Sequence, residues 1–567
     1  MAGQSSDSRL HRMCQAALAL LGSCYRSGAV ISLMLLWLRA VGLVGQAVSI
    51  GGAIFAVAVV RPSRPSDPAR ALDRILALVT RGALLAAAAQ GGVLVVLARA
   101  MGDDAGWPLG AVLDSTVGVI GLIRIAVALA GAAVAHALRR HPDSTTLGAL
   151  LVGGGALLAL TGALASHAVG RIEGSVWLVA VGALHQAAAA TWVGGLVCAT
   201  VLALRSTPAA SESWLRPFSR LALAAVAALA LTGAALSLAY IATPVAAIGT
   251  SYGAMTLTKI VLFIAMLTMG ALNHRALHGR LGTRSRLGSG ARAAPDLPRS
   301  GSPVLRRRLE VEAGLAIVTV FLAASIGSAP PAADVQDQRA SLAEIRSVFT
   351  PQWPRLQAPS LAELAAATAL GDPSTPHSAE ETAWSEFGHH VAGLFVVAMG
   401  VLAMLERSGW APWARHWPLL LIGLTGFVAW NMDPEGWQTG RIGFWEHLLG
   451  LEVLQHRILL ALTALLAVAE WRVRSGRHPD SAWRYVFPLV CIGAGVLLLS
   501  HAHEVSNAKA AFLIELTHLP LGLIILVAGW SRWLELRLSP PENVAPGRLW
   551  GPALTVFGLL LLFYRES

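Results

Sequence analysis

Long apolar runs, rather than an alternation of apolar and polar positions, dominate this chain. Runs such as 147–169 and 221–241 contain no Asp, Glu, Lys or Arg. Roughly 20 such residues are enough for an α-helix to cross the hydrocarbon core of a bilayer. The pattern therefore predicts an all-α, polytopic membrane protein. About fourteen transmembrane helices are expected near residues 37–60, 75–98, 110–138, 147–169, 175–204, 218–241, 254–274, 309–328, 386–405, 415–431, 447–470, 484–502, 509–531 and 549–564.

A polar stretch divides these helices into two groups. Residues 329–384 are rich in Pro, Asp, Glu and Ser, and they are too polar to cross a bilayer. We predict an N-terminal arm at 1–36 and a first membrane domain of about eight helices at 37–328. An extracytoplasmic linker at 329–384 and a second membrane domain of about six helices at 385–567 complete the predicted organisation.

The positions of the charged residues indicate whether the chain binds nucleic acid or lies in a lipid bilayer. The net charge is +11, which alone would suggest nucleic acid, but only 13% of residues are charged, about half the usual share for a soluble protein. The Arg residues concentrate in short loops, such as 61–74 and 472–484, which alternate with loops of few or balanced charges. The positive-inside rule places the Arg-rich loops in the cytoplasm. We therefore predict no nucleic-acid partner and a multi-pass protein in the lipid bilayer of a bacterial inner membrane.

Nine of the seventeen histidines gather in the predicted outer half of the helices. A single buried histidine is more often a structural hydrogen-bonding residue, but nine on one side weaken that interpretation. An ionisable side chain deep in a membrane costs several kcal/mol unless it is paired or ligated. Imidazole is a common ligand of copper, zinc and haem iron. The predicted shallow metal ligands are His167, His389, His390, His447, His501 and His503, and those roughly 14 Å deep are His185, His456 and His518.

Carboxylates accompany some of these histidines at helical spacing. The pairs are Glu386–His389, Glu452–His456 and Glu515–His518. Residues three or four apart share one face of a helix, so the carboxylate can orient the imidazole or bind the same metal. We therefore add Glu452 and Glu515 to the predicted metal ligands. The four cysteines are scattered, without a CxxC pair, and predict no thiolate site.

One short segment of the first half of the sequence resembles a segment of the second half. Ser166-His167-Ala168 is followed by His185 on the next predicted helix, and Ser500-His501-Ala502-His503 is followed by His518. Two interpretations stay open. The second half is a diverged repeat of the first, as in many transporters, or the short likeness is coincidental.

Several further motifs follow one another along the chain. The first half has Ser166-His167-Ala168, His185 followed by Trp192, Gly194 and Gly195, then Tyr252-Gly253, Lys259, Asn273 and Glu312. The linker and second half have Pro330-Pro331, Phe349-Thr350-Pro351, Trp353-Pro354-Arg355, His389-His390, Asp433-Pro434-Glu435 and Gln455-His456-Arg457. In this order of motifs, over about residues 40–535, the chain resembles the copper resistance protein D family of bacterial inner membranes.

This resemblance implies copper handling, usually understood as uptake of periplasmic copper. The chain departs from the family in lacking an attached periplasmic copper-binding β-domain and a Met- or His-rich outer tract. The resemblance then implies either delivery of copper by a separate periplasmic copper chaperone or a different substrate.

Three functions remain open at this point. The first is a non-enzymatic copper transport or handling protein, without a nucleotide-binding motif. The others are a membrane redox protein carrying haem b and an assembly factor that delivers copper to a cuproenzyme. We favour an ion over haem, because Leu519-Pro520 after His518 would crowd a planar ring. Glu452 and Glu515 also suit a cation.

Overall fold

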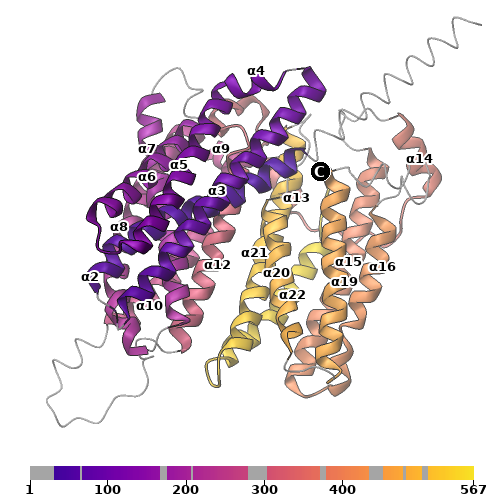
Figure 1. Cartoon of the computed structure of the whole chain (residues 1–567). Coiled ribbons are helices and arrows are strands. Elements are labelled where there is room, and N and C mark those ends of the chain that lie inside the picture. Colours follow the sequence, from indigo (N-terminus) through magenta and orange to yellow (C-terminus); the bar gives the residue numbers. More distant parts are fainter. Residues whose placement is uncertain are drawn as a thin grey trace, which may run out of the picture.

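Two helix bundles lie side by side in the computed structural model of this chain (Figure 1). The structure describes residues 31–63, 65, 67–106, 108–166, 175–205, 208–278, 303–370, 378–432, 451–476, 481–500 and 508–566. Within these residues, 13 helices are long and apolar enough to cross a membrane, and Leu419–Asn431 is a shorter apolar helix. The predicted all-α membrane fold with close to fourteen spans is confirmed. We call the end of the molecule that carries the predicted extracytoplasmic loops the predicted outer end.

The first bundle is built on close contacts between backbones. Its long helices are Ile31–Ser63, α3 (Pro68–Ala105), α5 (Thr116–Arg140), α6 (Thr145–Leu164), α7 (Ser175–Ala203), α8 (Pro208–Ile241), α10 (Ser251–His278) and α12 (Pro303–Ile326). A methyl group at Gly51 would lie 2.1 Å from the carbonyl oxygen of Ala190, and one at Gly194 would lie 2.0 Å from that of Ala47. Only glycine permits this approach of Ile31–Ser63 to α7, as is usual for small residues between membrane helices.

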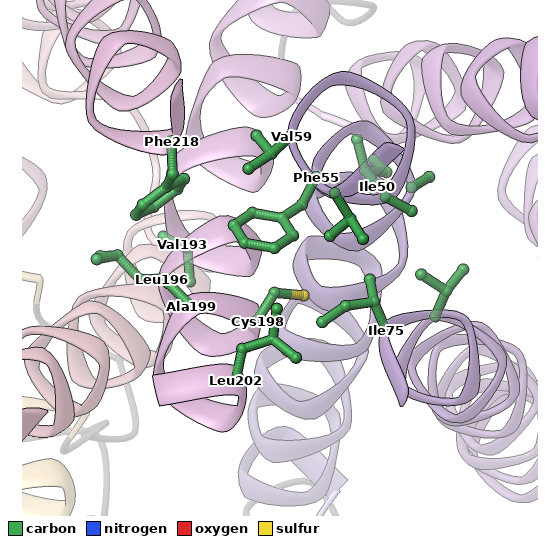
Figure 2. Close-up of a cluster of buried hydrophobic side chains, with 14 of the residues drawn as sticks. Ile50, Phe55, Val59, Ile75, Val193, Leu196, Cys198, Ala199, Leu202 and Phe218 are labelled. Carbon is green, nitrogen blue, oxygen red and sulfur yellow. The ribbon is translucent and has the colours of Figure 1, made fainter. Parts of the chain in front are cut away.

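An apolar cluster fills the space beside this contact (Figure 2). The ring of Phe55 meets that of Phe218 edge to face at a centroid distance of 5.4 Å. Cys198, Ile75 and Leu202 are buried around it. Because lipid is as apolar as these side chains, close packing and dispersion hold the helices together here.

The second bundle is a closed ring of six helices. These are α15 (Ala379–Ser408), α16 (Leu419–Asn431), α19 (Leu451–Arg474), α20 (Val486–Leu499), α21 (Ala508–Arg537) and α22 (Val544–Leu562). Each helix contacts the next in this order, and α22 packs along α15 to close the ring. With 13 residues, α16 is roughly 20 Å long, which is shorter than the hydrocarbon core.

Short helices occupy the linker and several turns. They are α4 (Leu109–Asp114), α9 (Pro244–Gly249), α13 (Leu342–Val348), α14 (Leu361–Leu370), η2 (Ala332–Asp334), η3 (Gln336–Gln338), η4 (Pro412–His416) and η5 (Ala482–Tyr485). The π-helical stretch η1 (Ala56–Val60) and α2 (Arg61–Ser63) form the end of the long helix Ile31–Ser63. The linker is anchored where Lys509 Nζ lies 2.7 Å from Glu344 Oε1. The hydrogen bonds from Lys509 and Ser341 lower the pKa of Glu344 to about 2. This carboxylate therefore stays charged and keeps α13 on α21.

The helix α15 begins seven residues before the predicted position 386, so that boundary was placed too late. Ser378 and Glu381 form a capping box, in which each side chain accepts a hydrogen bond from the other residue's backbone N–H. Glu380 lies in the same first turn, where the positive end of the helix dipole favours acidic residues. Residues that look like a solvated loop in the sequence therefore form the start of a helix.

Contacts between α12 and α21 join the two bundles. Glu310 accepts hydrogen bonds from Trp533 Nε1 and from Arg537, both at 3.0 Å. A methyl group at Gly314 would lie 2.0 Å from the indole ring of Trp530, so glycine leaves the space that this ring needs. A charged contact and a close fit thus combine in one interface.

Charged side chains tie the second bundle together at the end opposite the predicted outer end. Arg474 of α19 donates to Glu470 at 2.8 Å and also to Glu406 of α15. Its guanidinium lies over the ring of Trp417 at 4.8 Å and over that of Trp550 at 5.7 Å. A single arginine therefore links α19 to α15, α22 and the turn before α16.

The orientation of the bundles gives a testable prediction. Ser341 and Ser475 are both exposed, the first in the linker and the second directly after α19. With Cys14 and Cys24 replaced, a cysteine at position 341 should react with an impermeant thiol reagent added to intact cells, and one at position 475 should react only after lysis. Labelling of position 475 alone in intact cells would reverse the orientation.

Candidate functional site in the second bundle

Two histidines from different helices meet beside a tyrosine in the six-helix ring. The ring centroids of His389 on α15 and His518 on α21 are 6.2 Å apart, with an interplanar angle of 83°. Tyr564, just after α22, stacks on His389 at 4.0 Å and meets His518 edge-on at 5.9 Å. His456 of α19 faces the same cavity as these two histidines. Four helices or their ends therefore bring three imidazoles and a phenol together.

The backbone fixes which nitrogen of each ring carries the proton. Nδ1 of His389 lies 2.9 Å from the carbonyl oxygen of Ser385, and Nδ1 of His518 lies 2.8 Å from that of Ile514. A carbonyl oxygen can only accept, so both Nδ1 atoms donate and both Nε2 atoms carry the lone pair. Metal-binding histidines commonly have this arrangement, with the second nitrogen held by a carbonyl or carboxylate.

The structure changes the predicted depth of His389. This residue lies ten positions after the first residue of α15, and His518 lies ten positions after the first residue of α21. Both are therefore roughly 15 Å along their helices. His389 was predicted to lie at the start of a helix, but α15 starts earlier and His389 lies beside His518, one of the predicted deep histidines.

His390 has a structural role in this arrangement. Its Nδ1 accepts a hydrogen bond from the backbone N–H of Arg355 at 2.7 Å, and its Nε2 donates to the carbonyl oxygen of Tyr564, also at 2.7 Å. Both ring nitrogens are thus in use, and the side chain is 2% exposed. Glu386, predicted to accompany His389, instead accepts from Arg355 Nε at 3.4 Å. His390 and Glu386 therefore hold the linker against the ring.

His185 lies in the first bundle, so the three predicted deep histidines are divided between the two bundles. Its Nδ1 is 3.0 Å from the hydroxyl oxygen of Thr232 on α8. That hydroxyl donates to the carbonyl oxygen of Ala228 at 2.6 Å, so it accepts from the imidazole. His185 consequently also presents Nε2 as the nitrogen with the lone pair.

A cavity of about 360 Å³ lies inside the six-helix ring. His389, His456 and His518 line it together with mostly apolar side chains. Among the described residues that line it there is no Asp, Glu, Lys or Arg. The imidazoles are therefore grouped on the wall of a space with little charge.

Several predicted ligands are not placed by the structure. His167, His447, His501 and His503 lie outside the described residues, as does the side chain of Glu452. Glu515 is buried on α21. In the part of the chain that is described, no three His, Cys, Asp or Glu side chains are arranged to hold a metal ion. The metal ligands stay predictions.

Sequence reasoning did not single out Tyr564 or Asn431, although both lie at this site. Asn431 ends an apolar run, and the backbone carbonyl of this residue accepts from Trp384 Nε1 at 2.8 Å. A methyl group at Gly388 would lie 2.1 Å from its amide nitrogen, so glycine lets the amide reach α15. A side-chain amide at the end of an apolar run was the signal that could have found Asn431.

A second buried polar pair lies in the first bundle. Asn273 Nδ2 of α10 donates to Glu312 Oε2 of α12 at 3.0 Å, and both side chains are buried. Both residues belong to the motifs on which the family resemblance was based. The pair joins two helices through one hydrogen bond.

Comparison with known proteins gives one match, which includes this pair. Residues 212–326 match the model of a family described as copper resistance protein D. The matched stretch covers most of α8 and all of α9, α10 and α12. Neither the curated proteins nor the solved structures gave a match to the chain. The chain is thus a multi-pass helical protein in which residues 212–326 of the first bundle are similar to the copper resistance protein D family.

Proposed function

We propose that this protein handles copper ions in a bacterial inner membrane and takes them from the predicted outer side. The family match supports a role in copper resistance. One structural observation carries the proposal further. His185, His389 and His518 each donate Nδ1–H to a fixed protein oxygen and present Nε2 as the nitrogen with the lone pair. Imidazole with this orientation is a suitable ligand for copper.

His389 and His518 form the proposed central copper site. Metal–nitrogen bonds of about 2 Å on each side of an ion place two imidazole centroids roughly 6 Å apart. The observed centroid distance is 6.2 Å. His456 lines the same cavity, although the described side chains do not form a group of three metal ligands. A small ion needs only a few such ligands, whereas His390 has both nitrogens occupied and takes no part.

The predicted topology indicates the route by which copper would reach the central site. The predicted shallow histidines would capture copper before it reaches the imidazoles inside the ring, and a separate periplasmic chaperone would deliver it. The sequence has no nucleotide-binding motif, so movement would be passive or coupled to an ion gradient. His185 provides a nitrogen ligand for copper in the first bundle, beside the segment 212–326 that matches the family model.

Substitution of His185 tests the part played by the first bundle. We expect His185→Ala to reduce copper accumulation by cells on the order of tenfold, and Thr232→Val to reduce it in the same direction by releasing Nδ1. His136→Ala is the control, because His136 is an exposed histidine on α5. Copper is measured by elemental analysis at equal amounts of membrane-inserted protein. Equal copper in the His185 and His136 variants would remove His185 from the path.

A further inference from the structure

Three side-chain amide atoms in the second bundle have no hydrogen-bond partner among the residues that the structure describes. Both Nε2 and Oε1 of Gln455 are buried without a partner, and so is Oδ1 of Asn431. The two side chains are 5% and 9% exposed, and both line the cavity inside the ring. Each buried polar atom without a partner costs about 1–3 kcal/mol. Such groups therefore point to a ligand that both accepts and donates hydrogen bonds.

The cavity is long and narrow. Ser385 and Met399 both line it, and they are fourteen residues apart on α15, which corresponds to roughly 21 Å. A volume of about 360 Å³ over this length accommodates a single chain more readily than a broad planar ring. The amides and the histidines are at the Ser385 end, and apolar side chains such as Val396 and Leu424 line the remainder.

We infer that this cavity binds an uncharged, single-chain amphiphile with a hydrogen-bonding head group, an isoprenoid quinol or a hydroxyl-headed lipid. Gln455 Nε2 donates to an oxygen of the head group, and a hydroxyl of the head group donates to Gln455 Oε1 or Asn431 Oδ1. The chain extends from there towards Met399. A charged head group is disfavoured, because no Asp, Glu, Lys or Arg is found among the described lining residues. The inference does not depend on copper binding.

A comparison of two bulky substitutions on α16 tests this site. Leu424 lines the cavity, whereas Ile422, on the same helix, is 57% exposed on the outside of the bundle. The full-length protein is purified in mild detergent, extracted with organic solvent and analysed by mass spectrometry and ultraviolet absorption. We expect about one molecule of amphiphile per protein in the unmodified chain and in Ile422→Trp. In Leu424→Trp we expect at least a tenfold loss.

Ultraviolet absorption distinguishes the two sources, because a quinone ring absorbs and a hydroxyl-headed acyl lipid does not. Gln455→Leu provides a second test that adds no bulk. It should lower the retained amphiphile at least tenfold, and in ligand-stripped protein it should leave the melting temperature unchanged or raise it, since a buried amide without a partner has been removed. Equal retention in folded Leu424→Trp and Ile422→Trp, or no stoichiometric amphiphile in the unmodified protein, would overturn the inference.

Discussion

Replacement of both His389 and His518 by alanine should lower the copper bound by the purified protein to less than about a tenth of its original amount. The two rings come from different helices, and each presents Nε2 because its Nδ1 donates to the backbone. Loss of both removes two of the three imidazoles that are found among the described lining residues of the cavity. His456 alone cannot hold a small ion firmly, because copper sites in proteins use several ligands.

The measurement combines elemental analysis with an optical spectrum. His416→Ala is the control, because His416 is exposed in η4 and does not line the cavity. It should retain the copper of the unmodified protein. We also expect the unmodified protein to be colourless in the Soret region. A strong Soret band that disappears in the His389 and His518 double variant would replace the copper interpretation with the haem alternative.

Replacement of Arg474 by alanine should destabilise the second bundle by about 3–5 kcal/mol. Glu470, to which Arg474 donates at 2.8 Å, is 0% exposed, so the variant leaves a buried carboxylate without this partner. The contacts of the guanidinium with Trp417 and Trp550 are lost as well. Removal of one member of a buried ion pair costs more than removal of both. The double variant of Arg474 and Glu470 to alanine should therefore recover part of the loss.

Thermal unfolding in detergent, followed by circular dichroism, measures this effect. Arg70→Ala is the matched control, because Arg70 and Asp67 form an ion pair with side chains 69% and 50% exposed. The free energy of unfolding should then change by less than about 1 kcal/mol. If both arginine variants unfold at the same temperature, the buried network does not stabilise the bundle.

The sequence was most informative about the helices themselves. Runs of about 20 apolar residues, such as that in α7, fix a spanning helix because a bilayer offers the backbone no other hydrogen-bond partner. Boundaries were less well determined. The start of α15 was missed because Glu380 and Glu381 look like loop residues when the reciprocal hydrogen bonds of the capping box are not known.

The site was predicted in part. The histidines were recognised from their position in apolar helices, but which of them meet depends on the order in which α15, α19 and α21 pack around the ring. Sequence spacing also favoured carboxylates as the groups that orient the imidazoles. In the structure a backbone carbonyl four residues earlier orients His389 and His518, and any helix supplies such a carbonyl. Local spacing therefore could not reveal it.

The closure of the six-helix ring by α22 has a consequence for how the cavity forms. During synthesis, α15 enters the membrane well before α22, and the chain from Ser408 to Val544 takes roughly seven to thirty seconds to make. Through that interval the face of α15 that later packs against α22 borders lipid. A membrane-soluble molecule can then enter sideways, without a gate. Arrival of α22 encloses it, and His390 secures the closure through its hydrogen bond to Tyr564.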